Sequence, residues 1–179
     1  MKDFHKKMKD FGRTGGRGNY NSKISERIFS RLKKKDNTTI FSLEEAYNED
    51  IEKFEFIIIG ASIRYGKHRD NLFKFIKKNK RTLDSKVTAF FSVNVVARKP
   101  EKSEAHTNPY IKKFILLSDW KPNYLTVFAG KIDYPKLRIF DKVMIKIIMW
   151  LTKGPTDTSI SHEFTDWGKV DEFTEKISS

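Results

Sequence analysis

The sequence contains no cysteine among its 179 residues. This excludes disulfides, thiolate catalysis and an iron–sulfur cluster held by thiolates. The four histidines, His5, His68, His106 and His162, lie far apart, and no pair has the spacing of metal ligands. No apolar stretch reaches the ~18 residues of a membrane span, and the basic N-terminus lacks the apolar segment of a secretory signal. The expectation is therefore a cytoplasmic protein without a protein-ligated metal.

Positive charge is in excess and unevenly distributed. The formal net charge is +13, and residues 1–36 hold twelve Lys or Arg against four Asp or Glu. Such an excess attracts anions, which include nucleic acid, anionic lipid and phosphate. Solvated surface lysines are the simpler explanation for much of it.

Apolar runs alternate with amphipathic stretches along most of the chain. The predicted strands are residues 38–43, 54–59, 87–93 and 124–129, and the predicted helices are residues 22–35, 71–79, 110–117, 136–151 and 167–177. This alternation predicts an α/β fold, in which helices cover both faces of a parallel sheet. Residues 1–21 are polar, basic and glycine-rich, and we expect an irregular N-terminal segment there, followed by one domain over residues 22–179.

The most informative run is the apolar strand that ends at Ile59 and is followed by Gly60, Ala61 and Ser62. A short continuous apolar run bounded by glycine is typical of a strand buried on both faces. Ligands bind at the carboxyl ends of such strands. The small, hydroxyl and aromatic residues that continue to Gly66 suit a flat cofactor with polar edges. An ordinary strand-to-helix turn is the alternative.

Three segments carry a resemblance to a known family. They are residues 58–68 (IIGASIRYGKH), residues 91–102 (FSVNVVARKPEK) and residues 140–149 (FDKVMIKIIM), the last followed by Thr156-Asp157-Thr158 and Thr165-Asp166-Trp167. Together they resemble the flavodoxin-like, quinone-dependent protoporphyrinogen IX dehydrogenases of bacterial haem synthesis, over about residues 22–179. The second string is long and unusual, which makes it more specific than a single glycine motif.

The resemblance implies a five-stranded flavodoxin-like sheet with FMN as cofactor. It also implies oxidation of protoporphyrinogen IX to protoporphyrin IX, with the electrons passed to a membrane quinone. No residue stands out as a general acid or base, because the flavin would carry the redox step. The basic residues of segment 97–121 are candidates to hold the two propionates of the substrate. Two alternatives remain: a flavodoxin-like electron carrier, and a non-enzymatic anion- or nucleic-acid-binding module that uses the basic N-terminal arm.

The residues expected to contact FMN lie in the strand-end loops and in the glycine-rich segment. Tyr65 is a candidate to stack on the flavin ring, and a surface tyrosine in a turn is the alternative. The residues after the third long apolar strand are expected on the substrate side. The full set is Ser62, Ile63, Arg64, Tyr65, Gly66, Ser92, Val93, Asn94, Gly130, Asp133, Tyr134, Gly16, Arg17, Gly18, Asn19 and Asn21.

The N-terminus departs from the family pattern. Members open with an apolar strand and a Ser-Thr-x-x-Gly-x-Thr phosphate loop, whereas residues 15–21 here read Gly-Gly-Arg-Gly-Asn-Tyr-Asn. The hydroxyls are missing, and residues 1–11 hold no apolar run. We therefore expect the first strand and the phosphate loop to be replaced or lost. Strands 38–43 and 54–59 would then keep unpaired backbone groups, which is costly when they are buried.

The helix predicted over residues 136–151 carries more apolar residues than one buried face needs. Arg138, Lys142 and Lys146 form a basic ridge along it. This combination predicts a helix that lies in the membrane interface, on the inner face of the cell membrane, where a quinone is reached. A core helix packed on the sheet is the alternative.

Overall fold

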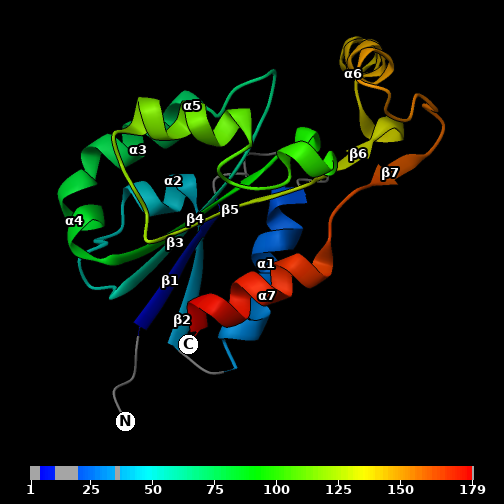
Figure 1. Ribbon diagram of the computed structural model, residues 1–179. Coiled ribbons are helices and arrows are strands. Elements are labelled where there is room, and N and C mark those ends of the chain that lie inside the picture. The colour runs from blue at the N-terminus through cyan, green and yellow to red at the C-terminus, as the bar shows by residue number, and fades with distance from the viewer. Residues whose placement is uncertain (1–4, 11–19, 35–36, 179) are drawn as a thin grey trace.

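The computed structural model describes residues 5–10, 20–34 and 37–178, with side chains from Lys23 onward. Five parallel strands form the main sheet: β1 (His5–Asp10), β2 (Asn37–Ser42), β3 (Phe56–Ser62), β4 (Val87–Val93) and β5 (Tyr124–Phe128). Their order is β2-β1-β3-β4-β5 (Figure 1). This is the strand order of flavodoxin, which confirms the predicted fold.

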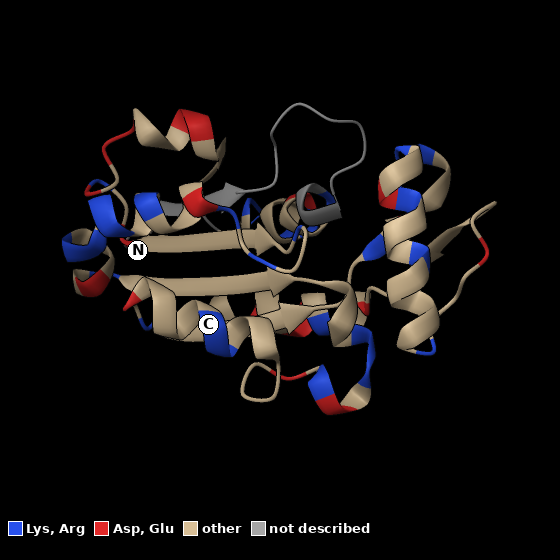
Figure 2. Cartoon of the chain, turned by 90° about the horizontal axis from the view of Figure 1, so that it is seen from above, with Lys and Arg blue, Asp and Glu red and all other residues tan. Residues whose placement is uncertain are grey.

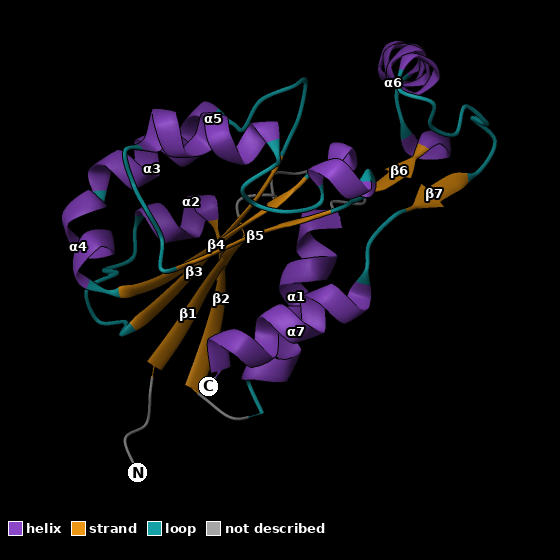
Figure 3. Cartoon of the chain, viewed as in Figure 1, coloured by secondary structure: helices purple, strands orange, loops and turns teal. Residues whose placement is uncertain are grey.

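Helices cover both faces of the sheet (Figure 3). On one face lie α1 (Tyr20–Leu32) and α7 (Trp167–Ser178). The other face is covered by α2 (Leu43–Tyr47), α3 (Asp70–Lys78), α4 (Lys80–Ser85) and α5 (Pro109–Ser118). Short 3₁₀ turns η1 (Val95–Arg98), η2 (Pro100–Lys102) and η3 (Tyr134–Lys136) complete the connections.

The loss of the first strand, which the sequence suggested, is wrong. Strand β1 lies at the centre of the sheet, in register with β2 from His5 to Asp10 and with β3 from Lys6 to Asp10. The sequence HKKMKD has no apolar run, so a hydrophobicity criterion misses it. Its position follows from backbone pairing instead, because β2 and β3 each need a partner there. The N-terminal segment 1–21 is therefore not irregular throughout.

The core consists of two apolar layers, one on each face of the sheet. Successive β3 residues alternate between them: Ile57 and Ile59 pack toward α3 and α5, whereas Phe56 and Ile58 pack toward α1 and α7. All four are buried, which explains why this strand is a continuous apolar run. A packed core on both faces of the sheet therefore holds the ends of the strands in place.

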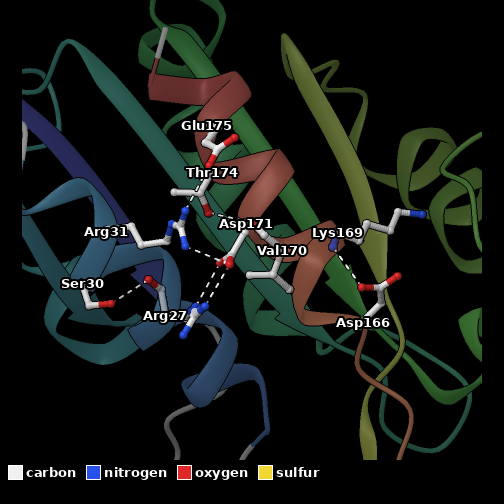
Figure 4. Close-up of polar contacts among 9 residues, drawn as sticks. All are labelled: Arg27, Ser30, Arg31, Asp166, Lys169, Val170, Asp171, Thr174 and Glu175. Carbon is white, nitrogen blue, oxygen red and sulfur yellow. Dashed lines mark hydrogen bonds and ion pairs between the residues drawn. The ribbon is translucent and has the colours of Figure 1, made fainter.

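Ion pairs join α1 to α7 (Figure 4). Asp171 accepts two hydrogen bonds from Arg27, of 3.0 and 2.8 Å, and lies 2.8 Å from Arg31. Arg31 also reaches Glu175 at 3.0 Å. The side-chain hydrogen bond from Arg27 is the main cause of the lowered pKa of Asp171. Because these groups are largely exposed to water, each pair contributes little to the stability of the fold.

An excursion leaves the sheet after β5. Strands β6 (Lys131–Asp133) and β7 (Ser161–Glu163) pair antiparallel, and between them the chain forms α6 (Ile139–Leu151). Figures 1 and 2 show α6 standing apart from the sheet and its covering helices. Among its thirteen residues, all of which the structure describes, only Met149 is buried. The alternative of a core helix packed on the sheet is therefore wrong.

Candidate functional site

The carboxyl ends of β3, β4 and β5 are joined by backbone hydrogen bonds just beyond the strands. The N–H of Ile63 donates to the carbonyl of Val93 at 2.9 Å, and the N–H of Asn94 donates to that of Phe128 at 3.0 Å. Gly130 follows closely, since a Cβ there would lie 3.0 Å from Val93 Cγ1. The structure thus brings together the three strand-end segments that the sequence singled out.

The loop over residues 62–66 is a tight hairpin. Arg64 and Lys67 exchange backbone hydrogen bonds of 3.0 and 3.1 Å, and the tip is formed by Tyr65 at φ +49° and Gly66 at φ +75°. Positive φ suits glycine but strains tyrosine. Ser62 and Ile63 are half-buried, whereas Arg64, Tyr65 and Gly66 are exposed. The loop therefore offers both backbone and side chains at the surface.

Tyr65 contacts the excursion. Its hydroxyl donates a 2.9 Å hydrogen bond to the carboxylate of Asp141 on α6, while the side chain as a whole is 71% exposed. This hydrogen bond is the main cause of the raised pKa of Tyr65. The phenol thus links the β3 loop to the first turn of α6, and its stacking on a flavin stays a prediction.

The end of β4 is buried and polar. Asn94 Oδ1 accepts from the N–H of Ala97 at 3.0 Å and from Asn108 Nδ2 at 3.3 Å. Its own Nδ2 is buried and has no hydrogen-bond partner in the part of the chain that the structure describes. An unpaired buried donor is costly and is typical of a group that awaits a ligand or water. The site is therefore suited to a cofactor with carbonyl or ring-nitrogen acceptors, as FMN has.

The residues after β5 take structural roles. Asp133 pairs with Lys136 at 2.9 Å and accepts from Ser161 Oγ at 2.8 Å, and these hydrogen bonds lower its pKa. Tyr134 is fully buried, and its hydroxyl donates to the carbonyl of Pro155 at 3.2 Å. Both residues hold the base of the excursion, and a substrate role for them is untested.

The predicted phosphate-loop residues Gly16, Arg17, Gly18 and Asn19 lie outside the described residues. Asn21 belongs to the first turn of α1, and its side chain is likewise not described. In the described ranges, no cluster of three or more His, Asp or Glu could hold a metal ion. None of the helices described is long and apolar enough to cross a membrane.

Two contacts at the site were not predicted from the sequence. His68 is buried, and one of its ring nitrogens, Nε2, lies 2.9 Å from Ser92 Oγ. Burial lowers its pKa to about 4, so the ring is neutral at pH 7. Arg98, one of the basic residues considered for propionate binding, donates to the carbonyl and hydroxyl of Thr152 at 3.2 and 2.8 Å; its role toward a propionate stays a prediction. Small and polar residues after a strand predict a loop, but they do not predict the contacts of His68 with Ser92 or of Arg98 with Thr152, because the partners are distant in sequence.

Comparison with known proteins now places the chain. The model of the flavodoxin domain family matches residues 19–159. The protein named protoporphyrinogen IX dehydrogenase [quinone] in Escherichia coli strain K12 is 44% identical over 127 residues, which cover 71% of this chain and 70% of that protein. This chain belongs to the flavodoxin-domain family of quinone-dependent protoporphyrinogen IX dehydrogenases. The resemblance noted in the sequence is thereby confirmed.

A second relative has the same name. The protoporphyrinogen IX dehydrogenase [quinone] of Leishmania major is 36% identical over 140 residues, which cover 78% of this chain and 61% of that protein. Among solved structures, the Fusobacterium nucleatum flavodoxin bound to flavin mononucleotide is 20% identical with a TM-score of 0.44, and the match covers 73% of this chain and 72% of that one.

Proposed function

We propose that this chain oxidises protoporphyrinogen IX to protoporphyrin IX with FMN as cofactor and passes the electrons to a quinone. The observation that carries the proposal is the 44% identity, over most of the chain, to a protein named for this reaction. In the overall reaction, one hydrogen leaves each of the four bridging carbons and one leaves each of two ring nitrogens. Three quinone molecules each take up two electrons and two protons and become quinols.

The chain's own residues would hold the cofactor at the joined strand ends. The backbone of residues 62–66 and 92–94 would border the flavin ring, and the unpaired Nδ2 of Asn94 would donate to it. The glycine-rich residues 15–18 precede α1 in the sequence, and backbone N–H groups ahead of a helix bind phosphate well. Bound FMN would supply the redox chemistry, while the protein supplies position and electrostatics.

Cofactor binding is tested by a pair of asparagine variants. Asn94→Ala removes the unpaired amide at the carboxyl end of β4. Asn123→Ala is the matched control, because Asn123 Oδ1 accepts from the N–H of Thr88 at 2.7 Å at the opposite end of the same strand. We expect FMN fluorescence titration to show weaker binding only for Asn94→Ala. If Asn94→Ala binds FMN as tightly as Asn123→Ala does, Asn94 does not contact the cofactor.

The activity itself is tested anaerobically with the FMN-loaded chain and chemically reduced substrate. Protoporphyrin fluorescence should rise only when a quinone is added, and quinol should form in proportion. A chain that binds FMN but produces no porphyrin above the rate without protein would contradict the proposal. Porphyrin formation that does not depend on quinone would contradict the assigned acceptor.

We further propose that α6 makes peripheral contact with the membrane in which the quinone resides. Ile139, Phe140, Trp150 and Leu151 are between 67% and 84% exposed, and exposed apolar side chains on one helix mark an interaction surface. Of the predicted basic ridge, Lys142 and Lys146 lie on this helix and Arg138 is its N-cap, which suits anionic head groups. Peripheral attachment at the cytoplasmic face would bring the strand-end loops near a quinone.

Liposome co-sedimentation tests this contact. We expect the wild-type chain to sediment with vesicles that contain anionic lipid, and the double variant Phe140→Ser/Trp150→Ser to remain in the supernatant. Leu116→Ser/Leu117→Ser is the matched control, since these exposed leucines lie on α5, away from α6. If the control loses binding as strongly as the α6 variant, or if the wild-type chain never sediments, α6 is not the contact.

A further inference from the structure

A cavity of about 310 Å³ lies beside the β3 loop, between the start of α3 and one face of α5. A cavity of this volume is at the lower end of the range for small-molecule sites. It therefore admits one or two fused rings, not a whole tetrapyrrole. The lining side chains that matter are Lys67, His68, Phe73, Tyr110, Lys113 and Phe114.

The inner walls are aromatic and rigid. Phe114 is fully buried and stacks on Phe90 with ring centroids 3.9 Å apart. Phe73 lies 6.1 Å from Phe114, centroid to centroid. The His68 ring packs edge-on against both phenylalanines that line the cavity. Walls of this kind favour a flat unsaturated ring.

The rim is cationic. Lys67 and Lys113 are both exposed and line the cavity from opposite elements. Lys67 reaches Asp70 at 3.3 Å, but both side chains are more than 60% exposed, so this pair is weak. His68 adds no charge at pH 7, because burial lowers its pKa to about 4. Asp70 also lines the cavity, so two lysines accompany one carboxylate there. The net charge of the rim is still positive, which favours an anionic substituent on the bound ring.

The cavity adjoins both loops proposed to border the flavin. Lys67 closes the hairpin with Arg64 through two backbone hydrogen bonds. His68 contacts Ser92 at the end of β4. A ring held in the cavity would therefore lie next to the strand ends.

We propose that this cavity holds one propionate-bearing edge of the tetrapyrrole substrate. One pyrrole ring lies against Phe73, with the buried Phe114 behind it, and its propionate lies between Lys67 and Lys113. The inference rests on the proposed function and adds to it a site for the substrate. A quinone head group is also flat, but it is neutral, so two rim lysines favour the carboxylate.

The experiment compares protoporphyrin IX with its dimethyl ester, which keeps the ring and loses the charge. Binding to the full FMN-loaded chain is followed by porphyrin absorbance and fluorescence. Lys67→Met and Lys113→Met should each weaken binding of the diacid about tenfold and leave the ester unchanged. Lys74→Met is the matched control, because Lys74 is exposed on α3 next to Phe73 but does not line the cavity, and this variant should bind the diacid as the wild-type chain does.

Two outcomes would overturn the proposal. In the first, the diacid binds Lys67→Met and Lys113→Met as tightly as it binds the wild-type chain. In the second, the neutral quinone menadione displaces the diacid and binds the lysine variants unchanged, which would assign the cavity to the quinone. Wild-type turnover is measured in parallel. If the wild-type chain turns over but the lysine variants bind the diacid normally, only the cavity assignment is wrong. If the wild-type chain does not turn over but diacid binding depends on the two lysines, the proposed activity is wrong and the cavity assignment is supported.

Discussion

The hydroxyl of Tyr65 donates a 2.9 Å hydrogen bond to the carboxylate of Asp141. This contact joins the tip of the β3 loop to the first turn of the protruding helix α6. A second contact, from Arg98 to Thr152, joins the segment after β4 to the end of the same helix. Both loops proposed to border the flavin are thus attached to the proposed membrane contact.

Removing the first attachment should loosen the start of α6. In Tyr65→Phe and Asp141→Asn, we expect faster amide hydrogen exchange over residues 139–143, with no change in the sheet. Above the raised pKa of Tyr65, the wild-type phenol loses its proton and with it this hydrogen bond, so alkaline pH should reproduce the effect. If exchange over these residues is the same in both variants as in the wild-type chain, the bond does not restrain α6.

The second attachment should contribute more to stability, because Arg98 is partly buried and donates to several oxygens. Arg98→Met should lower the free energy of unfolding by about 1–2 kcal/mol, measured by urea denaturation. Arg98→Lys should recover only part of this, since an ammonium group cannot reproduce the planar fork. The exposed Lys121→Met serves as control. An Arg98→Lys variant as stable as the wild-type chain would contradict this role.

His68 should make stability depend on pH in a predictable direction. Its pKa falls from 6.5 to about 4 on folding, because burial penalises the charged ring. The unfolded chain therefore binds a proton before the folded chain does, and stability falls as pH drops from about 6.5 to about 4. The loss amounts to roughly 3 kcal/mol. In His68→Gln, the free energy of unfolding measured with urea should change less with pH across this window. If it changes with pH as steeply as in the wild-type chain, another group titrates there.

Gly60 and Gly66 should respond to alanine for different reasons. A Cβ at Gly60 would lie 2.2 Å from Cζ of the buried Phe91, and such overpacking costs about 1–3 kcal/mol. A Cβ at Gly66 meets nothing within 4 Å, but φ is +75°, which costs about 1 kcal/mol. The double variant Gly60→Ala/Phe91→Leu should unfold at a higher temperature than Gly60→Ala alone, because the smaller side chain makes room for the added Cβ. Absence of recovery would mean that the ring is not the obstacle.

The sequence predicted the elements whose apolar pattern is strong. The β4 range came out with the observed bounds, Val87–Val93, and the predicted α5, α6 and α7 differ by a few residues at their ends. What failed was β1, because its lysine-rich sequence signals nothing to a hydrophobicity criterion. The short pair β6 and β7 was also missed, since three residues are too few to show a period.

The candidate site divides in the same way. The strand-end loops were found because small and polar residues directly follow apolar runs. The contacts of Tyr65 and Arg98 with α6 span 76 and 54 residues of sequence, and no local pattern specifies such a partner. The cavity walls are similarly formed by α3 and α5, which meet only after the chain has folded. Local sequence patterns therefore predicted the loops of the site, but they did not predict which distant segments pack against those loops.

The pairing of β6 with β7 has a consequence for how this fold can be rebuilt. Asp133 and Ser161 are partners in the antiparallel ladder, so the chain leaves and re-enters the body at neighbouring points about 5 Å apart. A two-residue hairpin turn could join these points directly. The excursion between them is therefore a removable module, and a gene that encodes the shortened chain would separate what the flavodoxin-like body does alone from what the module adds.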